Sequence, residues 1–258
     1  VRVIPKGIYY VVEIVYNMNP TDLGLNKHRG LSIDLGVSNL ITAANNVDLP
    51  RFTIKGGTAK SINQFFNKCL AHLQSIAART NGRQTTKRMG HLSRVRANKL
   101  GDIFHKASRA VLDFCVWHDI GTIAIGYNPL WKQRCRLGKR TNQNFVQLPL
   151  LSLVRQIQYK AALVGIIVII VDESYTSRCS FVDGESIGPH GRYLGRRVQG
   201  GLFQSREGMI INADVNAAYN ILRKAVPEAF ADGIADVGLH PVLLEPVSTK
   251  RKITYLSK

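Results

Sequence analysis

The stretch LSIDLGVSNLIT, residues 31–42, decides the fold, because it places one acidic residue inside an apolar strand that ends at a glycine turn. Residues 31–35, 39–43 and 47–54 have strand composition, with turn residues between them. Connections this short predict antiparallel hairpins. Burying Asp34 costs free energy unless a cation or hydrogen bonds compensate it. Asp34 is therefore either a turn residue that faces solvent or part of a functional site.

Helical and strand patterns then alternate along the chain. Apolar residues recur at three- and four-residue steps from Ser61, a predicted N-cap, to about His118, which predicts a helical hairpin. The later predicted elements are a short buried strand at 122–126, an amphipathic helix at 147–164, a strand covered on both faces at 166–171, and a closing helix at 210–224. This order predicts an α/β fold with a mixed sheet and a right-handed parallel crossover.

Two further acidic positions end predicted elements. Asp172 and Glu173 follow strand 166–171, and Asp214 lies near the start of the last helix. Each has an ordinary alternative, since an acid can cap a helix, lie in a solvated loop or complement a helix dipole. The predicted sheet, however, brings Asp34, Glu173 and Asp214 to one edge. Carboxylate oxygens bind Mg²⁺, and two ions about 3.5 to 4 Å apart can stabilise both reacting oxygens of a phosphodiester. The predicted reaction is metal-assisted hydrolysis of nucleic acid.

Composition indicates a polyanionic partner. The 258 residues include 35 Lys and Arg against 17 Asp and Glu, a formal net charge of +18, and 45% hydrophobic residues, enough to bury a core. No apolar run approaches the roughly 18 residues of a membrane span. The cysteines Cys69, Cys115, Cys135 and Cys179 form no C-x-x-C pair for zinc. We expect an intracellular protein, cytoplasmic and associated with the nucleoid, without a membrane partner.

Basic residues are concentrated between residues 79 and 140, where 14 Lys and Arg face only Asp102, Asp113 and Asp119. Such a segment can bind a phosphate backbone, whereas a merely solvated helix face would interleave acids at i,i+4 spacing, which we do not expect here. Trp131 either stacks on a base or fills the core under a loop. The predicted nucleic-acid-binding residues are Arg79, Arg83, Lys87, Arg88, Arg94, Arg96, Lys99, Trp131, Lys132, Arg134, Arg136, Arg196 and Arg197.

Several segments resemble one known family. They are LSIDLGVSNLIT, SINQFF, IAIGYNPLWKQ, NQNFVQLP, VDESYTS, GRRVQGGLF and INADVNAAYNILRK. They resemble TnpB, or OrfB, the accessory protein of bacterial insertion sequences, which is similar to type V CRISPR effectors and eukaryotic Fanzor proteins. The resemblance extends from residue 1 to about 240. It implies an RNase H-like, RuvC-like domain that uses two Mg²⁺ ions, or Mn²⁺ in their place. It also implies a transposon-encoded guide RNA that directs the protein to target DNA beside a short motif.

The chain departs from that family at two places. The first and third catalytic acids map to Asp34 and Asp214, but Gly126 replaces the glutamate that most members carry. A subset of the family uses a relocated glutamate in a D-E-S motif, which maps to Glu173. Most members also hold a four-cysteine zinc ribbon, where this chain has only Cys179. We therefore expect no structural zinc, and a cationic insert carrying Arg192, Arg196, Arg197 and Arg206.

The resemblance also implies a domain organisation. Because the chain starts at Val1, we expect an N-terminally truncated protein. The expected parts are a residual wedge strand and linker at 1–30, a nuclease domain at 31–226 with a hairpin at 61–118 and an insert at 176–206, and a tail at 227–258.

Two other functions remain open from the sequence. One is a catalytically inactive, truncated, transposon-derived protein that only binds nucleic acid. The other is a transposase that itself transfers DNA strands, since such enzymes share RNase H-like acids and a basic charge.

Overall fold

The computed structural model describes the chain except residues 8, 81–84, 129–147, 232, 234–240 and 245–258. Its centre is a six-stranded mixed sheet of order β11-β5-β4-β3-β6-β7. These strands are β3 (Gly30–Leu35), β4 (Asn39–Asn45), β5 (Phe52–Lys55), β6 (Thr122–Gly126), β7 (Ile167–Val171) and β11 (Val242–Leu243). The predicted antiparallel hairpins are confirmed for β3–β4 and β4–β5, and β6 runs parallel to both β3 and β7.

The strands form where β-branched and other apolar residues can be covered on both faces. Leu31, Ile33, Ile123 and Ile125 are fully buried in the central strands. The expectation that residues 166–171 form a strand covered on both faces is wrong. In the described part of the chain β7 is the last strand of the sheet, and Ile170 in it is 40% exposed.

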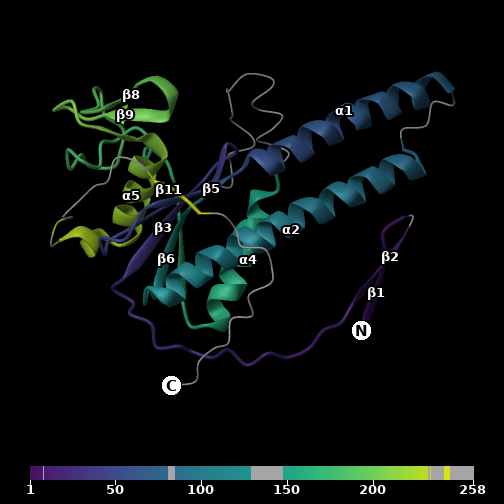
Figure 1. Cartoon of the computed structure of the whole chain (residues 1–258), viewed down its shortest axis with the longest axis horizontal. Coiled ribbons are helices and arrows are strands. Elements are labelled where there is room, and N and C mark those ends of the chain that lie inside the picture. The colour runs from purple at the N-terminus through teal and green to yellow at the C-terminus, as the bar shows by residue number, and fades with distance from the viewer. Residues whose placement is uncertain (8, 81–84, 129–147, 232, 234–240, 245–258) are drawn as a thin grey trace.

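The helical hairpin consists of α1 (Gly57–Thr80) and α2 (Lys87–Trp117), which pack side by side and project from the sheet (Figure 1). The expected N-cap at Ser61 is wrong, since α1 begins four residues earlier and Ser61 lies inside it. Helix α2 is capped by Thr86, whose side chain accepts a hydrogen bond from the Met89 amide. Leu100, Phe104 and Val111 of α2 are buried in the main core.

Two further helices cover the sheet. Helix α4 (Leu150–Leu163) packs against α2 and β7, and α5 (Ala213–Ala225) packs against β3, β4, β6 and β7. The predicted closing helix 210–224 starts too early, because residues 210–212 form strand β10 (Ile210–Asn212). The side chain of Asn212 caps α5 by accepting from the amides of Asp214 and Val215.

The remaining elements are short. Strand β1 (Arg2–Pro5) pairs with β2 (Tyr10–Glu13) in a separate hairpin, which contacts α2 where Arg94 lies over the Tyr9 ring. The segment before α5 contains a small sheet of β8 (Arg196–Arg197), β9 (Leu202–Gln204) and β10, with the 3-10 turn Gln199–Gly201. A 3-10 turn at Pro227–Phe230 follows α5. No helix within the described residues has the length and apolarity that crossing a membrane requires.

Candidate active site

The sheet register brings the predicted acids to one edge. Ile33 of β3 lies beside Ile125 of β6, and Gly126 lies beside Val171 of β7. Asp34 therefore lies at the row where β6 and β7 end, and Glu173 follows two residues after that row. Helix α5 starts at the same edge, since Asp214 in its first turn accepts a hydrogen bond from Asn39 at the start of β4.

Asp34 interacts electrostatically with both of the other acids. Burial, and then the charge of Asp214, raise the pKa of Asp34 to about 8, while Arg197 acts in the opposite direction. Burial, followed by the charges of Asp34 and Asp172, raises the pKa of Glu173 to about 8. Asp34 is thus an electrostatic neighbour of both Asp214 and Glu173. Grouped carboxylates with raised pKa values are typical of functional sites.

The two adjacent acids at the end of β7 have different surroundings. Asp172 is exposed, and its Oδ1 accepts hydrogen bonds from the amide and hydroxyl of Ser174, which makes it a turn residue. Glu173 is less exposed and faces Asp34 electrostatically. Lys224 of α5 donates to the carbonyl oxygen of Asp172 at 2.6 Å and so ties this turn to the helix that carries Asp214.

Glu173 lies beside the position that lacks the usual glutamate. A Cβ atom placed on Gly126 would lie 3.4 Å from the Cβ of Glu173 and 2.5 Å from Cδ1 of Ile221. The space next to Gly126 is therefore filled by Ile221, while the Glu173 side chain starts from the same neighbourhood. The backbone places a carboxylate near this position from β7 instead of β6.

Asp214 is held by groups that differ in charge. Its Oδ1 accepts from Nη2 of Arg197 at 3.1 Å, and its Oδ2 accepts from Nδ2 of Asn39 at 2.7 Å. Asn39 Oδ1 in turn accepts from Nζ of Lys55 at 3.1 Å. Sequence reasoning missed Asn39 and Lys55 as site residues. Asn39 could have been noticed in the sequence because it is a polar residue at the start of the apolar strand β4. Nothing in the sequence around Lys55 marks it as a site residue.

Carboxylate oxygens are the ligands that a hard divalent cation prefers, and Asp34, Glu173 and Asp214 are the carboxylates at this edge. Burial and then neighbouring negative charge raise the pKa of Asp34 and of Glu173, and a bound cation would offset that charge. Among the described residues, no group of three or more His, Cys, Asp or Glu side chains is arranged to hold a metal ion. The carboxylates are therefore neighbours without forming a finished ligand set, and the magnesium site stays a prediction.

The insert, residues 176–206, does not supply a zinc-ligand set. Cys179 is its sole cysteine, is fully buried, and donates from Sγ to the carbonyl oxygen of Gly188. Burial raises the pKa of this thiol, which disfavours the thiolate that binds zinc. The residues present do not fit the metal that most family members hold.

The predicted nucleic-acid-binding residues separate into four groups. Exposed side chains on the outer part of the hairpin are Arg79, Lys87, Arg88 and Lys99. Arg94 and Arg96 are partly buried, and Arg96 donates to Asn63 Oδ1 at 2.7 Å and lies over the Phe66 ring, so it joins the two helices. Arg83, Trp131, Lys132, Arg134 and Arg136 lie outside the described residues. Arg196 and Arg197 are exposed on β8.

The expectation that acids do not interleave with the bases is wrong for one half of α2. Lys106 pairs with Asp102 and Arg109 pairs with Asp113, both at i,i+4 spacing and both at 2.8 Å. The preceding part of α2, residues 87–101, contains no acid. The unopposed positive charge of this helix is therefore confined to its N-terminal half.

The insert presents two open hollows. The first hollow is lined by Arg192 and Arg206, and the second by Arg178 and Arg197. Tyr193 and Gly195 line both hollows. Arg196 lines both hollows, and Arg197 reaches Asp214. A cationic surface that includes the aromatic residues Tyr193 and Phe203 thus extends to Arg197, which pairs with Asp214.

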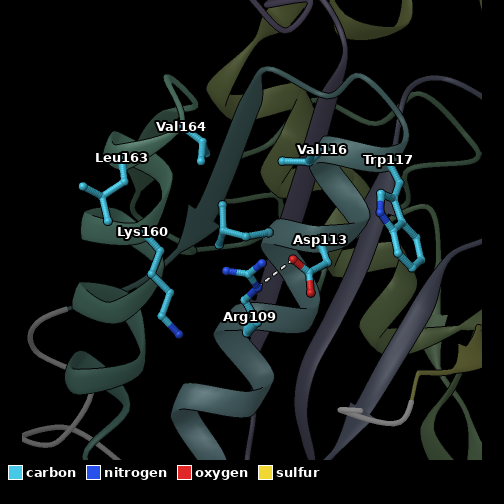
Figure 2. Close-up of a pocket in the computed structure, with 8 residues that line it drawn as sticks. Arg109, Asp113, Val116, Trp117, Lys160, Leu163 and Val164 are labelled. Atoms are coloured by element: carbon cyan, nitrogen blue, oxygen red, sulfur yellow. Dashed lines mark ion pairs between the residues drawn. The ribbon is translucent and has the colours of Figure 1, made fainter. Parts of the chain in front are cut away.

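A third cavity lies far from this edge. It lies between the C-terminal halves of α2 and α4, where Arg109, Asp113, Trp117 and Lys160 line it (Figure 2). Both helices lead into the N-terminal ends of β6 and β7, whereas the acids lie at the C-terminal ends. Burial, and then the charge of Arg109, lower the pKa of Lys160 to about 8. Its position separates this cavity from the chemistry of the acids.

Comparisons with known proteins identify relatives over most of the chain. Residues 13–131 match OrfB_IS605, a family described as a probable transposase, and residues 152–221 match the Cas12f1-like TNB domain. The CRISPR-associated endodeoxyribonuclease Cas12f1 of Sulfoacidibacillus thermotolerans is 27% identical over 241 residues, which cover 89% of this chain and 53% of that protein. The chain thus spans about half the length of this curated relative.

Solved structures have the same fold. A chain of the Cas12f1-sgRNA-target DNA complex matches with a TM-score of 0.54 and 17% identity, over 79% of this chain and 51% of that one. A chain of a CRISPR-Cas12f ternary complex matches with a TM-score of 0.55 and 16% identity, over 80% and 40%. The mixed sheet and its helices are an α/β, RNase H-like fold. The two family matches and the Cas12f1 relative support a TnpB-like protein of the type V effector family, and the solved structures agree with it in fold.

Proposed function

We propose that this chain is the RuvC-like nuclease part of an RNA-guided, metal-dependent DNA endonuclease of a transposable element. The observation that carries the proposal is the position of Asp34, which is an electrostatic neighbour of both Asp214 and Glu173 at one sheet edge. Placing these carboxylates close together lowers the free energy of unfolding. A site for a catalytic divalent cation would explain why the fold nevertheless brings them together.

Asp34, Glu173 and Asp214 are the residues that would hold Mg²⁺ or Mn²⁺. When bound, two such ions supply an activated water and stabilise the leaving oxygen of the phosphodiester. Asn39 orients the Asp214 carboxylate from β4, because it donates to Oδ2 and leaves Oδ1 for other partners. Arg197 offsets part of the negative charge and is placed to contact a phosphate oxygen of the substrate.

Nucleic acid is the proposed partner on both sides of the acids. The arginine-lined hollows of the insert would hold the DNA strand that enters the site, with Tyr193 available for stacking. The N-terminal half of α2 would bind the backbone of a guide RNA or its duplex with target DNA. That a relative is named an endodeoxyribonuclease and that related complexes contain sgRNA and target DNA support these partners.

Substituting the three acids one at a time tests the proposal. Asp34→Ala, Glu173→Ala and Asp214→Ala should each lower magnesium-dependent cleavage by about a hundredfold or more, because each removes charge from the hydrolytic site. Cleavage is measured on the complete protein with guide RNA and target DNA. Guide binding, measured by filter retention, should stay within about threefold of wild type because the phosphate contacts lie elsewhere.

Asp172→Asn is the matched control for Glu173→Ala. It alters the adjacent acid but keeps the Oδ1 acceptor that holds the Ser174 turn. We expect its cleavage rate to stay close to that of wild type. Full cutting by Glu173→Ala would reject the relocated glutamate. Binding without cutting by the wild-type protein would favour the inactive nucleic-acid-binding alternative instead.

A further inference from the structure

Glu185 is a buried carboxylate at the centre of the insert. It is 6% exposed, and each of its oxygens accepts a backbone hydrogen bond. Oε2 accepts from the Ser180 amide at 2.7 Å, and Oε1 accepts from the Leu194 amide at 2.9 Å. The Glu185 amide also donates to the Ser180 carbonyl at 3.1 Å. One side chain therefore joins two loop segments that lie 14 residues apart in the sequence.

Helix α5 compensates the charge and closes the same loop. Arg223 donates to the carbonyl oxygens of Glu185 and of the Asn220 side chain, and its guanidinium lies 5.4 Å from the centre of the Phe181 ring. It is also an electrostatic neighbour of Glu185. A buried carboxylate with two amide donors and a nearby cation has the partners that it needs.

Two asparagines of α5 hold the loop that starts the insert. Asn216 accepts from the Phe181 amide and donates to the Cys179 carbonyl, both at 2.9 Å. Asn220 donates to the carbonyls of Thr176 and Cys179, both at 2.8 Å. Both asparagines are fully buried. The insert is thus attached to the helix that carries Asp214 by buried hydrogen bonds within the chain.

The hydrogen bonds from the Ser180 and Leu194 amides to Glu185, called the clamp below, are connected to the acids through Arg197. Leu194, held by Glu185, lies three residues before Arg197, and Arg197 pairs with Phe203 in the β8–β9 ladder and with Asp214. We propose that Glu185 is a positioning residue that takes the structural role of the zinc ribbon, closing the insert without metal and holding Arg197 against Asp214. The second half of this proposal rests on the proposed nuclease function, and the first half does not.

Hydrogen exchange of the complete chain tests the metal-free clamp. Glu185→Ala removes both acceptors, and Glu185→Gln replaces one acceptor by an amide donor. Glu207→Gln is the matched control, because Glu207 is exposed immediately after the insert. We expect amide exchange at least about tenfold faster around Ser180 and Leu194 in Glu185→Ala, an intermediate effect in Glu185→Gln, and none in the control.

The β8–β9 ladder is followed in the same experiment. If Glu185 positions Arg197, exchange in residues 196–204 rises with that at Leu194, whether or not the protein cuts DNA. An unchanged ladder would overturn the positioning role. A stoichiometric zinc content, or faster exchange of the wild-type insert after addition of a zinc chelator, would overturn the metal-free clamp.

Cleavage kinetics separate positioning from general loss of folding. At saturating DNA, Glu185→Gln should slow cutting about tenfold with little change in DNA affinity, because a misplaced group affects the reaction more than binding. In an Arg197→Lys background the same substitution should have a smaller effect, since Glu185 acts through Arg197. Equal losses in both backgrounds would reject this coupling. Should wild type itself fail to cut, the nuclease proposal fails, and the exchange experiment still decides the clamp.

Discussion

Asp34 makes the protein's stability depend on pH in an unusual direction. Its pKa rises from 3.8 to about 8 on folding, so the folded protein binds more protons than the unfolded chain between these values. Stability without divalent ions should therefore fall as pH rises from about 4 to about 8, and change little above. Glu173, with its raised pKa, acts in the same direction.

Asp34→Asn should remove much of this dependence. We expect the variant to be more stable than wild type at pH 8 by about 1 to 2 kcal/mol and nearly equal to it at pH 4, because the amide cannot ionise. Thermal unfolding in a chelating buffer across this pH range measures the difference. Parallel curves for the two proteins would show that Asp34 is not the group responsible.

Single residues also explain why acids adjacent in sequence differ in role. The Asp172 carboxylate accepts hydrogen bonds from Ser174 within a turn. The Glu173 carboxylate is instead desolvated by burial and interacts with the charge of Asp34. The distinction comes from the turn geometry after β7 and from Ile221, which fills the space next to Gly126. Position 126 is a glycine and supplies no carboxylate to this edge of the sheet. The carboxylate of Glu173 can take that place.

At the scale of elements, β7 differs from its neighbour β6 although both are apolar. Ile170 is 40% exposed, and its register partner Ile125 is fully buried. The same substitution at these two positions gives a matched comparison. Ile125→Thr should lower the free energy of unfolding by about 2 to 4 kcal/mol, and Ile170→Thr by less than about 1 kcal/mol, because only the first buries a hydroxyl and leaves a void.

Urea unfolding of the two variants measures these free energies. Equal losses would mean that Ile170 is as well covered in solution as Ile125. The comparison therefore tests whether β7 is a true edge strand in solution.

At the scale of the whole molecule, the insert and the N-terminal half of α2 each carry a cluster of basic residues. The two halves of α2 provide a test of nucleic-acid binding. Replacing Lys87, Arg88 and Lys99 by Gln should reduce the slope of log affinity against log salt by about 2 to 3, because about 0.9 counterions per phosphate contact are no longer released.

Lys106→Gln with Arg109→Gln is the control, since both cations already pair with acids on the same helix. We expect a much smaller change in the slope. Fluorescence anisotropy with a labelled RNA or RNA–DNA duplex at several salt concentrations gives these values. Equal changes in both variants would indicate that net charge, and not the outer half of α2, governs binding.

The sequence by itself determined the antiparallel β3–β4 and β4–β5 hairpins, the helical hairpin and the parallel pairing of β6 with β7. Apolar periodicity and glycine turns are local properties, so residues 31–42 and 122–126 could be interpreted without their neighbours. Only the tertiary structure decided which side chains face one another. It separated Glu173 from Asp172, showed β7 to be an edge strand, and joined Glu185 to the amides of Ser180 and Leu194. Such contacts depend on which distant segments pack together in the fold, and the apolar periodicity of the sequence does not predict this.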